Sequence, residues 1–178
     1  KKGEEPIIYP GSYAIPADKM DEFYNLYIKK VFIDKKKEYL TERQTQAGGP
    51  VLIDLDFRYG TQIDERQHDE NHITDLIDLY LSEILELISI KNGAQIPIFI
   101  LEKDEININS EDFNIVKDGI HIIIGICMDH THQQLLRKHI MTDAEGTDNK
   151  IDYILDDLPL TNSYAEVLDC GITKGHTN

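Results

Sequence analysis

The chain has 178 residues, and its 18 Lys and Arg against 33 Asp and Glu give a formal net charge of −15. This length fits one domain, and the acidic excess argues against a domain that grips nucleic acid through a broad basic surface. With 40% hydrophobic residues the chain can bury a core, which excludes wholesale disorder. The longest apolar run, residues 120–128, is shorter than the roughly 18–20 residues that span a bilayer, so no membrane association is expected. Two cysteines are too few for a disulfide scaffold or a four-cysteine zinc site and indicate reduced thiols in an intracellular protein.

The first part of the chain predicts one helix between two short strands. Residues 17–33 carry apolar side chains at helical spacing, with Asp18 as the candidate N-cap. Short strands are expected at 13–15 and 38–42. Residues 1–12 are expected to form a flexible leader.

The middle of the chain alternates strands and helices. Residues 51–58 form the clearest strand, and buried strands are expected at 96–101 and 120–126. The strongly periodic segment 73–88 predicts a helix with one broad apolar stripe. A further helix is expected at 131–141, with Leu135, Leu136 and Ile140 facing inward.

The last part of the chain is less regular. Residues 143–150 are expected to be an exposed linker, Ile151 begins a short apolar turn, and Asn162 or Ser163 caps a final helix. Strands and helices mix without a regular βαβ alternation, which favours an α/β or α+β sandwich. Both ends read as cut, so the chain is expected to be a fragment of a longer polypeptide.

The strand at 51–58 carries the most informative residues, Asp54 and Asp56. Strand side chains alternate, so these two carboxylates and Arg58 lie on one face, about 7 Å apart along the strand. Two such carboxylates repel each other if they are left unpaired, and a bound Mg²⁺, which prefers hard oxygen ligands, would remove the repulsion. The alternative is a solvated strand face on which Arg58 neutralises part of the charge.

The strand at 120–126 begins after a second polar pattern, Lys117-Asp118-Gly119-Ile120-His121. A lone histidine in an apolar run is commonly a hydrogen-bonded core residue. Alternatively, Lys117 and His121 lie on the same face as the carboxylate pair and hold a triphosphate, and Gly119 lets the backbone approach a ligand closely. The pair His68 and His72 has the spacing of a metalloprotease helix but lacks the Glu after the first His, so that motif fails.

Four segments in order resemble a known family: GPVLIDLDFRY (49–59), IFILEK (98–103), VKDGIHII (116–123) and LPLTNSYAEVLD (158–169). They are similar to the primase part of the primase-helicases of nucleocytoplasmic large DNA viruses, within the archaeo-eukaryotic primase superfamily. The resemblance covers most of the chain from about Tyr13 onward.

The resemblance implies a role for each matching residue. Asp54 and Asp56 match the first acidic motif of the family, and Gly119-Ile120-His121 matches the second, a small residue, any residue and His. Serine is common at the first position of that motif, so Gly119 departs from the pattern and leaves only its backbone amide for a phosphate. Lys117 matches a basic position used for the triphosphate, and Arg58 is expected to join these nucleotide contacts.

The third motif of the family is a hydrophobic residue followed by Asp, matched in this chain by Leu168-Asp169. Asp156 and Asp157 are rivals for this role, because the aromatic and Gly-Ser-x-Lys stretch that follows the motif in relatives is missing after Asp169. The resemblance implies that Asp54, Asp56 and the third Asp hold two Mg²⁺ or Mn²⁺ ions and that His121 is part of the catalytic site.

The resemblance further implies a DNA primase, a nucleotidyltransferase that makes primers from NTPs or dNTPs on a single-stranded DNA template during viral DNA replication. A two-metal nuclease or other phosphotransferase, and a non-catalytic domain that positions DNA for a helicase, are the alternatives. The expected partner is a helicase domain of the same polypeptide, through which any hexamer would form. The expected location is intracellular, at a viral replication site in the host cytoplasm or nucleus.

The implied fold is a mixed α/β primase catalytic core over residues 1–178, in two fused halves of which one is RRM-like, with its C-terminal end missing. Asp54 and Asp56 are expected on a central antiparallel sheet beside the strand of His121. The helices at 73–88 and 131–141 are expected to cover one face of this sheet, and the open face is expected to be the active cleft.

Overall fold

The computed structural model describes residues 11–38, 40, 48–108, 114–142 and 150–170. It divides into two compact units, an N-terminal unit over Lys1–Thr41 and a sheet unit over Glu42–Asn178. Among the described residues, no helix has the length and hydrophobicity that crossing a bilayer requires. The predicted leader at 1–12, the linker at 143–150 and the C-terminal end lie largely outside the described residues.

The N-terminal unit contains one helical segment whose hydrogen-bonding pattern changes along its length. It starts as a 3-10 turn, continues as an α-helix and ends as a π-helical turn: Ala17–Lys19 (η1), Met20–Ile28 (α1) and Lys29–Ile33 (η2). The predicted helix over 17–33 is therefore confirmed. None of its residues is buried, and its aromatic rings pack on one another, with 6.0 Å between the centroids of Phe23 and Tyr27.

Other predictions for this unit are wrong. Asp18 is not an N-cap, because it lies inside η1 and neither η1 nor α1 has a side-chain cap. Residues 11–16 form no regular structure, since a strand at 13–15 without a partner would leave its backbone groups unpaired. Of the predicted strand at 38–42, Glu38 and Leu40 lie in no strand, and the other residues lie outside the described part.

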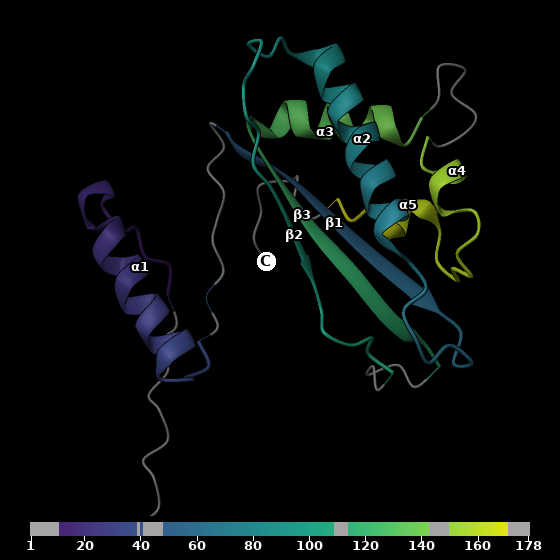
Figure 1. Cartoon of the computed structure of the whole chain (residues 1–178), viewed down its shortest axis with the longest axis horizontal. Helices are drawn as coiled ribbons and strands as arrows, with labels where there is room; N and C mark the ends of the chain where they lie inside the picture. Colours follow the sequence, from purple (N-terminus) through teal and green to yellow (C-terminus); the bar gives the residue numbers. More distant parts are fainter. Residues whose placement is uncertain (1–10, 39, 41–47, 109–113, 143–149, 171–178) are drawn as a thin grey trace, which may run out of the picture. The chain divides into compact units, whose positions relative to one another are not determined.

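The sheet unit is built on three antiparallel strands in the order β1-β3-β2 (Figure 1). They are Gly49–Tyr59 (β1), Ile98–Glu102 (β2) and Val116–Met128 (β3). The strands predicted at 51–58 and 120–126 are confirmed and are longer than predicted. The central strand is thus β3, with β1 on one side and β2 on the other.

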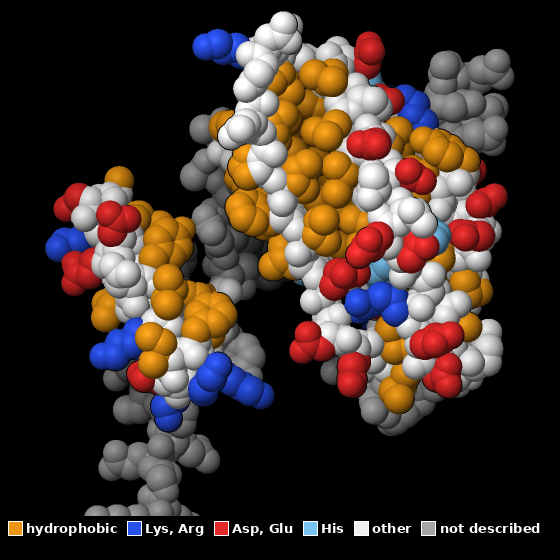
Figure 2. All heavy atoms as spheres, viewed as in Figure 1, with side chains coloured by type: hydrophobic (Ala, Val, Ile, Leu, Met, Phe, Trp, Pro, Cys, Tyr) orange, Lys and Arg blue, Asp and Glu red, His pale blue; other side chains and the backbone are white. Residues whose placement is uncertain are grey.

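The predicted burial of the strand at 96–101 is wrong. This strand, β2, begins at Ile98 and forms an edge of the sheet, and Phe99–Glu102 are exposed. Hydrophobic side chains gather on the surface between β2 and the longest helix (Figure 2). Ile100 of β2 is 46% exposed and Leu85 of that helix is 58% exposed. In this case the apolar run correctly predicts a strand, but it does not predict whether that strand is buried.

Three helices of the sheet unit begin at residues whose side chains cap them. Asp69 accepts hydrogen bonds from two backbone N–H groups at the start of α2 (Glu70–Leu87), and Asp129 accepts one at the start of α3 (His130–Ile140). Two short helices follow, α4 (Asp152–Leu155) and α5 (Tyr164–Val167). Ser163 and Glu166 form a capping box at α5, so Ser163 rather than Asn162 is the cap. The helices predicted at 73–88 and 131–141 are confirmed.

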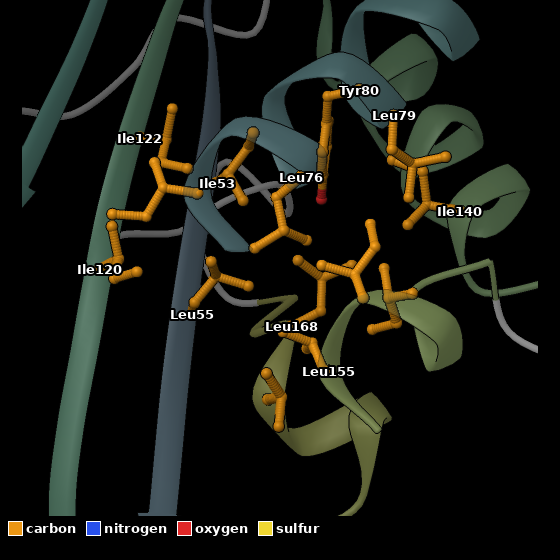
Figure 3. Close-up of a cluster of buried hydrophobic side chains, with 14 of the residues drawn as sticks. Ile53, Leu55, Leu76, Leu79, Tyr80, Ile120, Ile122, Ile140, Leu155 and Leu168 are labelled. Carbon is orange, nitrogen blue, oxygen red and sulfur yellow. The ribbon is translucent and has the colours of Figure 1, made fainter. Parts of the chain in front are cut away.

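The core lies between these helices and one face of the sheet (Figure 3). Alternate residues of β1, from Val51 to Tyr59, are at most 2% exposed. The sheet packs against side chains from the helices and from the segment after α5: Leu76, Tyr80, Leu136, Ile140, Leu155 and Leu168. Leu135, predicted to face inward, is 39% exposed. The predicted fold class is confirmed: a mixed α/β domain with helices on one face of its sheet and the other face open.

The outer edge of β1 is closed by the segment that precedes and follows α5. Isolated bridges join Tyr59 to Leu160 and Leu55 to Leu168. Between them, the side-chain amide of Asn162 donates to the Asp56 carbonyl at 2.9 Å and accepts from the Arg58 N–H at 3.1 Å. The C-terminal part of the chain therefore runs along β1 and reaches the open face.

Candidate active site

The sequence-predicted site residues of β1 and β3 lie in paired rows on the open face. Asp54 pairs with His121, Asp56 with Gly119, and Arg58 with Lys117. Because both strands alternate, all these positions point away from the helix-covered face. The prediction that the carboxylates, the histidine and the lysine share one face is therefore confirmed in the strand register.

The side chain of His121 forms an ion pair with the first carboxylate. Its Nε2 lies 2.9 Å from Oδ1 of Asp54, and the His121 side chain is 63% exposed while that of Asp54 is 15% exposed. The hydrogen bond to Asp54 raises the pKa of His121, as do the charges of Asp54 and Asp56, against the effects of burial and of Lys103. His121 is thus not a core histidine, which excludes that interpretation of the apolar run.

The second carboxylate, Asp56, lies in a field of like charge. Burial raises its pKa, and the neighbouring carboxylates of Asp54 and Asp169 raise it further, while Arg58 and His121 lower it. Arg58 also forms an ion pair with Glu166, at 3.7 Å between Nη1 and Oε1. Its charge is therefore shared between Glu166 and the carboxylate of Asp56. The expected repulsion at this face is present.

The third candidate carboxylate comes from the segment after α5. The backbone N–H of Asp169 donates to the carbonyl of Asp54 at 3.0 Å, and the charge of Asp169 acts on Asp56. The two rivals lie elsewhere: Asp157 accepts from Nε2 of His72 at 3.0 Å, and Asp156 acts on the hydroxyl of Tyr164. The geometry brings Asp169 to the other two carboxylates, and its role remains a prediction.

Comparison with known proteins decides the family. Residues 7–177 match the family model described as the "C962R protein N-terminal AEP domain", where AEP denotes the archaeo-eukaryotic primases. The chain belongs to this AEP family. The AEP domain is also 28% identical over 163 residues to a protein of Acanthamoeba polyphaga mimivirus named "Putative helicase L207/L206"; the alignment covers 91% of this chain and 16% of that protein. The chain therefore spans about a sixth of that relative's length.

Family membership makes the AEP domain a member of a superfamily of primase-type nucleotidyltransferases. The resemblance drawn from the four sequence segments is confirmed at this level. Nucleotidyl transfer of this kind generally uses divalent metal ions.

The donor set of the open face fits a hard divalent cation. Asp54, Asp56 and Asp169 offer carboxylate oxygens, and burial first, then the charges of Asp54 and Asp169, raise the pKa of Asp56. In the described part of the chain, no group of three or more His, Cys, Asp or Glu side chains is already placed to hold a metal ion.

Gly119 has a packing reason of its own to be glycine. A Cβ added at this position would lie 2.7 Å from the carbonyl oxygen of Leu55, so any side chain would push β3 away from β1. Its backbone N–H donates to Oδ1 of Asp118 at 2.9 Å. The departure from serine in the family motif thus coincides with a close approach of the two strands.

Sequence reasoning missed Arg137, which holds the third motif in place. Its Nε and Nη2 donate to the carbonyl of Leu168 at 3.1 and 2.7 Å, and Nη2 also donates to that of Ala165 at 3.1 Å. The residue lies near the end of α3, far from Leu168 in sequence. No local pattern indicates such a contact, because its acceptors are backbone carbonyls that any residue could supply.

Sequence reasoning also missed a buried charge cluster beneath the site. The Asp118 side chain is fully buried, and both its oxygens accept from the guanidinium of Arg66, at 3.0 and 3.3 Å. Buried His68 pairs with Glu102 at 2.7 Å, whereas His72 pairs with Asp69 and Asp157. The two histidines therefore do not form one site. Strand alternation could have found Asp118, since it shares a face with Ile120 and Ile122, but Arg66 comes from a distant loop.

Proposed function

We propose that this AEP domain is a DNA primase that forms phosphodiester bonds from NTPs or dNTPs on a single-stranded DNA template in viral replication. One observation carries the proposal: the segment after α5 joins β1 at Asp54 and Asp169, so carboxylates from two distant segments converge beside His121. Membership of the AEP family supports it. A structural role alone would not require three like charges at one place.

The proposed roles follow from position. Asp54, Asp56 and Asp169 would hold two Mg²⁺ or Mn²⁺ ions, which when bound activate the attacking hydroxyl and stabilise the leaving pyrophosphate. The 3′-oxygen attacks the α-phosphorus, the bond to pyrophosphate breaks, and the hydroxyl proton passes to water. His121, Lys117 and Arg58 lie on the same face and would hold the triphosphate and offset its charge.

The context of this activity is part of the same proposal. The mimivirus relative carries the word helicase in its name, and the aligned stretch is 16% of its length. We therefore place the domain in a polypeptide that also carries a helicase module, through which any hexamer would form. It would act inside the host cell, at the site of viral DNA replication.

The test compares four matched Asp→Asn variants on single-stranded template with NTPs or dNTPs and Mn²⁺ or Mg²⁺. Asp54→Asn, Asp56→Asn and Asp169→Asn are expected to lower nucleotide incorporation by at least about a hundredfold, because each removes a carboxylate that would hold the divalent ions on which the reaction depends. Asp157→Asn, a rival carboxylate outside the site, is the control and is expected to retain the activity. Gel analysis of labelled product measures both.

Two results would contradict the proposal. Unchanged incorporation by Asp54→Asn or Asp56→Asn would remove the carboxylate pair from the reaction. A template that is shortened rather than extended would instead indicate a nuclease using the same carboxylates with water as the nucleophile. Mn²⁺ binding, measured by electron paramagnetic resonance, is a second readout and is expected to weaken in Asp54→Asn and to persist in Asp157→Asn.

A further inference from the structure

The third strand of the sheet, β2, also reaches the open face next to His121. Leu101 of β2 pairs with His121 of β3. Residues two apart on an extended chain share a face, so Lys103 continues the open-face row of Phe99 and Leu101. The intervening residue confirms this alternation, because Glu102 points to the other side and pairs with buried His68 at 2.7 Å.

The backbone of Lys103 is anchored from beneath the sheet. Its carbonyl accepts a hydrogen bond of 2.6 Å from Nη2 of Arg66, and Arg66 is held in turn by the fully buried carboxylate of Asp118 at 3.0 Å. The position of Lys103 at the end of β2 is therefore set by the buried cluster. Its long side chain is exposed.

Lys103 shares the open face with His121. It follows by two residues the position of β2 that pairs with His121, so strand alternation puts both side chains on the same side of the sheet. In the part of the chain that the structure describes, Lys103 takes part in no salt bridge. An exposed lysine that forms no salt bridge there and shares its face with His121 and Lys117 favours the binding of an anion.

The described acidic side chains on the open face of the sheet lie on β1, and basic ones continue across the neighbouring strands. Asp54 and Asp56 lie on β1 together with Arg58, His121 and Lys117 lie on the central β3, and Lys103 follows β2. We infer that Lys103 binds the β- and γ-phosphates of the incoming nucleotide, on the side of the triphosphate remote from the carboxylates. This inference rests on the proposed function and adds a substrate contact to it.

The test measures binding of a fluorescent dATP analogue in Ca²⁺, which slows turnover. Lys103→Ala is expected to weaken its binding about tenfold, the loss of one charge-assisted hydrogen bond, and Lys103→Arg to restore most of it. Lys138→Ala, which removes an exposed charge from α3, is the control and is expected to bind as the unaltered domain does. Thermal unfolding checks that all variants are folded.

A triphosphate contact has a signature that a structural role lacks. The ratio of affinities for dATP and dAMP is expected to fall in Lys103→Ala, and in steady-state incorporation KM for the nucleotide is expected to rise more than kcat falls. Affinity for labelled single-stranded DNA, measured by anisotropy, is expected to stay unchanged. A selective loss of DNA affinity would overturn the inference and assign Lys103 to template phosphate.

The failure of this inference and of the proposed function can be told apart. Suppose that the unaltered domain extends a template and that Asp54→Asn does not. If the variants Lys103→Ala and Lys138→Ala then bind dATP equally well, only the inference on Lys103 is wrong. If Asp54→Asn extends the template as the unaltered domain does, the proposed function is wrong and the inference falls with it.

Discussion

Two carboxylates on neighbouring strands show how differently the two faces of this sheet treat charge. Asp118 of β3 faces the helices, is fully buried, and accepts hydrogen bonds from Arg66 and from the Gly119 N–H. Asp56 of β1, which pairs with Gly119, faces the open side, where burial and the charges of Asp54 and Asp169 raise its pKa. One carboxylate is compensated within the fold, and the other is left with excess negative charge.

The difference separates a structural charge from a functional one. A buried charge must be paired, since its desolvation would otherwise destabilise the fold. Asp118 meets this requirement with protein groups alone. The carboxylates of the open face are compensated only in part, by Arg58 and His121, and under the proposed function a bound cation would complete that compensation. The same reasoning makes Lys103, an exposed cation on the open face, a candidate contact for an anion.

The largest effect on stability is expected when the buried ion pair of Asp118 is removed from the helix-covered face. Asp118→Ala leaves the guanidinium of Arg66 without its buried partner and is expected to lower the free energy of unfolding by about 3–5 kcal/mol. Urea denaturation measures this, with Asp56→Ala as the matched variant on the open face. If Asp118→Ala lowered the free energy of unfolding no more than Asp56→Ala does, the proposed difference between the two faces would be contradicted.

A smaller effect of opposite sign is expected on the open face. Asp56→Asn removes one of the repelling charges and is expected to raise the free energy of unfolding of the metal-free domain at neutral pH, by less than about 1 kcal/mol because water screens an exposed carboxylate. The folded-state pKa of Asp56 is raised, so the gain is absent below the unfolded value of about 4 and develops as pH rises through the folded value. Chemical denaturation across pH measures it.

Adding Mn²⁺ gives the control for this prediction. The unaltered domain is expected to gain stability from the ion, whereas Asp56→Asn is expected to gain less. If the ion stabilised both proteins equally, Asp56 would not be part of the cation site, and its raised pKa would reflect burial and repulsion alone.

The smallest effect is expected at the start of α2, where His72 lies between Asp69 and Asp157, at 2.7 and 3.0 Å. Burial lowers the pKa of His72, but its hydrogen bonds to Asp157 and Asp69 raise it more. The stability from this pairing is present below the unfolded value of about 6.5 and is lost as pH rises through the raised value. His72→Gln, which can keep the capping box, is expected to cost a few tenths of a kcal/mol at pH 5.5.

Thermal unfolding of His72→Gln at pH 5.5 and pH 8.5 measures this difference. His132→Gln is the matched control, because His132 occupies the same position after its capping residue, Asp129, at 2.8 Å. The stability gap between His72→Gln and the unaltered domain is expected to narrow as pH rises, and a gap that widened instead would contradict the prediction.

Much of the open face could be predicted from the sequence because strand alternation is a local rule. Asp54 and Asp56 share a face with Arg58 in any regular strand, and Lys117 shares one with His121. The resemblance to primases added Asp169, which no local pattern indicates. Alternation also places Asp118 on the opposite face from His121, but a buried Asp is rare, so the local pattern alone does not predict its burial.

Burial of β2 could not be predicted in the same way. Ile98–Glu102 is apolar enough for a core strand, yet it forms an edge that the helices do not cover. The strand predicted at residues 13–15 is wrong for a related reason, since a strand forms only when another segment pairs with it. In both cases the local sequence does not say which other segment of the chain lies next to the strand.

The sequence by itself determined which residues could face one another along each strand, where the long helices run, and the family to which the domain belongs. These follow from periodicity and from short ordered motifs. Only the tertiary structure decided that Arg137 and Asn162 bring Asp169 to Asp54, that Arg66 neutralises Asp118, and that Lys103 shares a face with His121. Each of these joins segments distant in sequence, and such contacts depend on how the chain packs rather than on the residues that flank them.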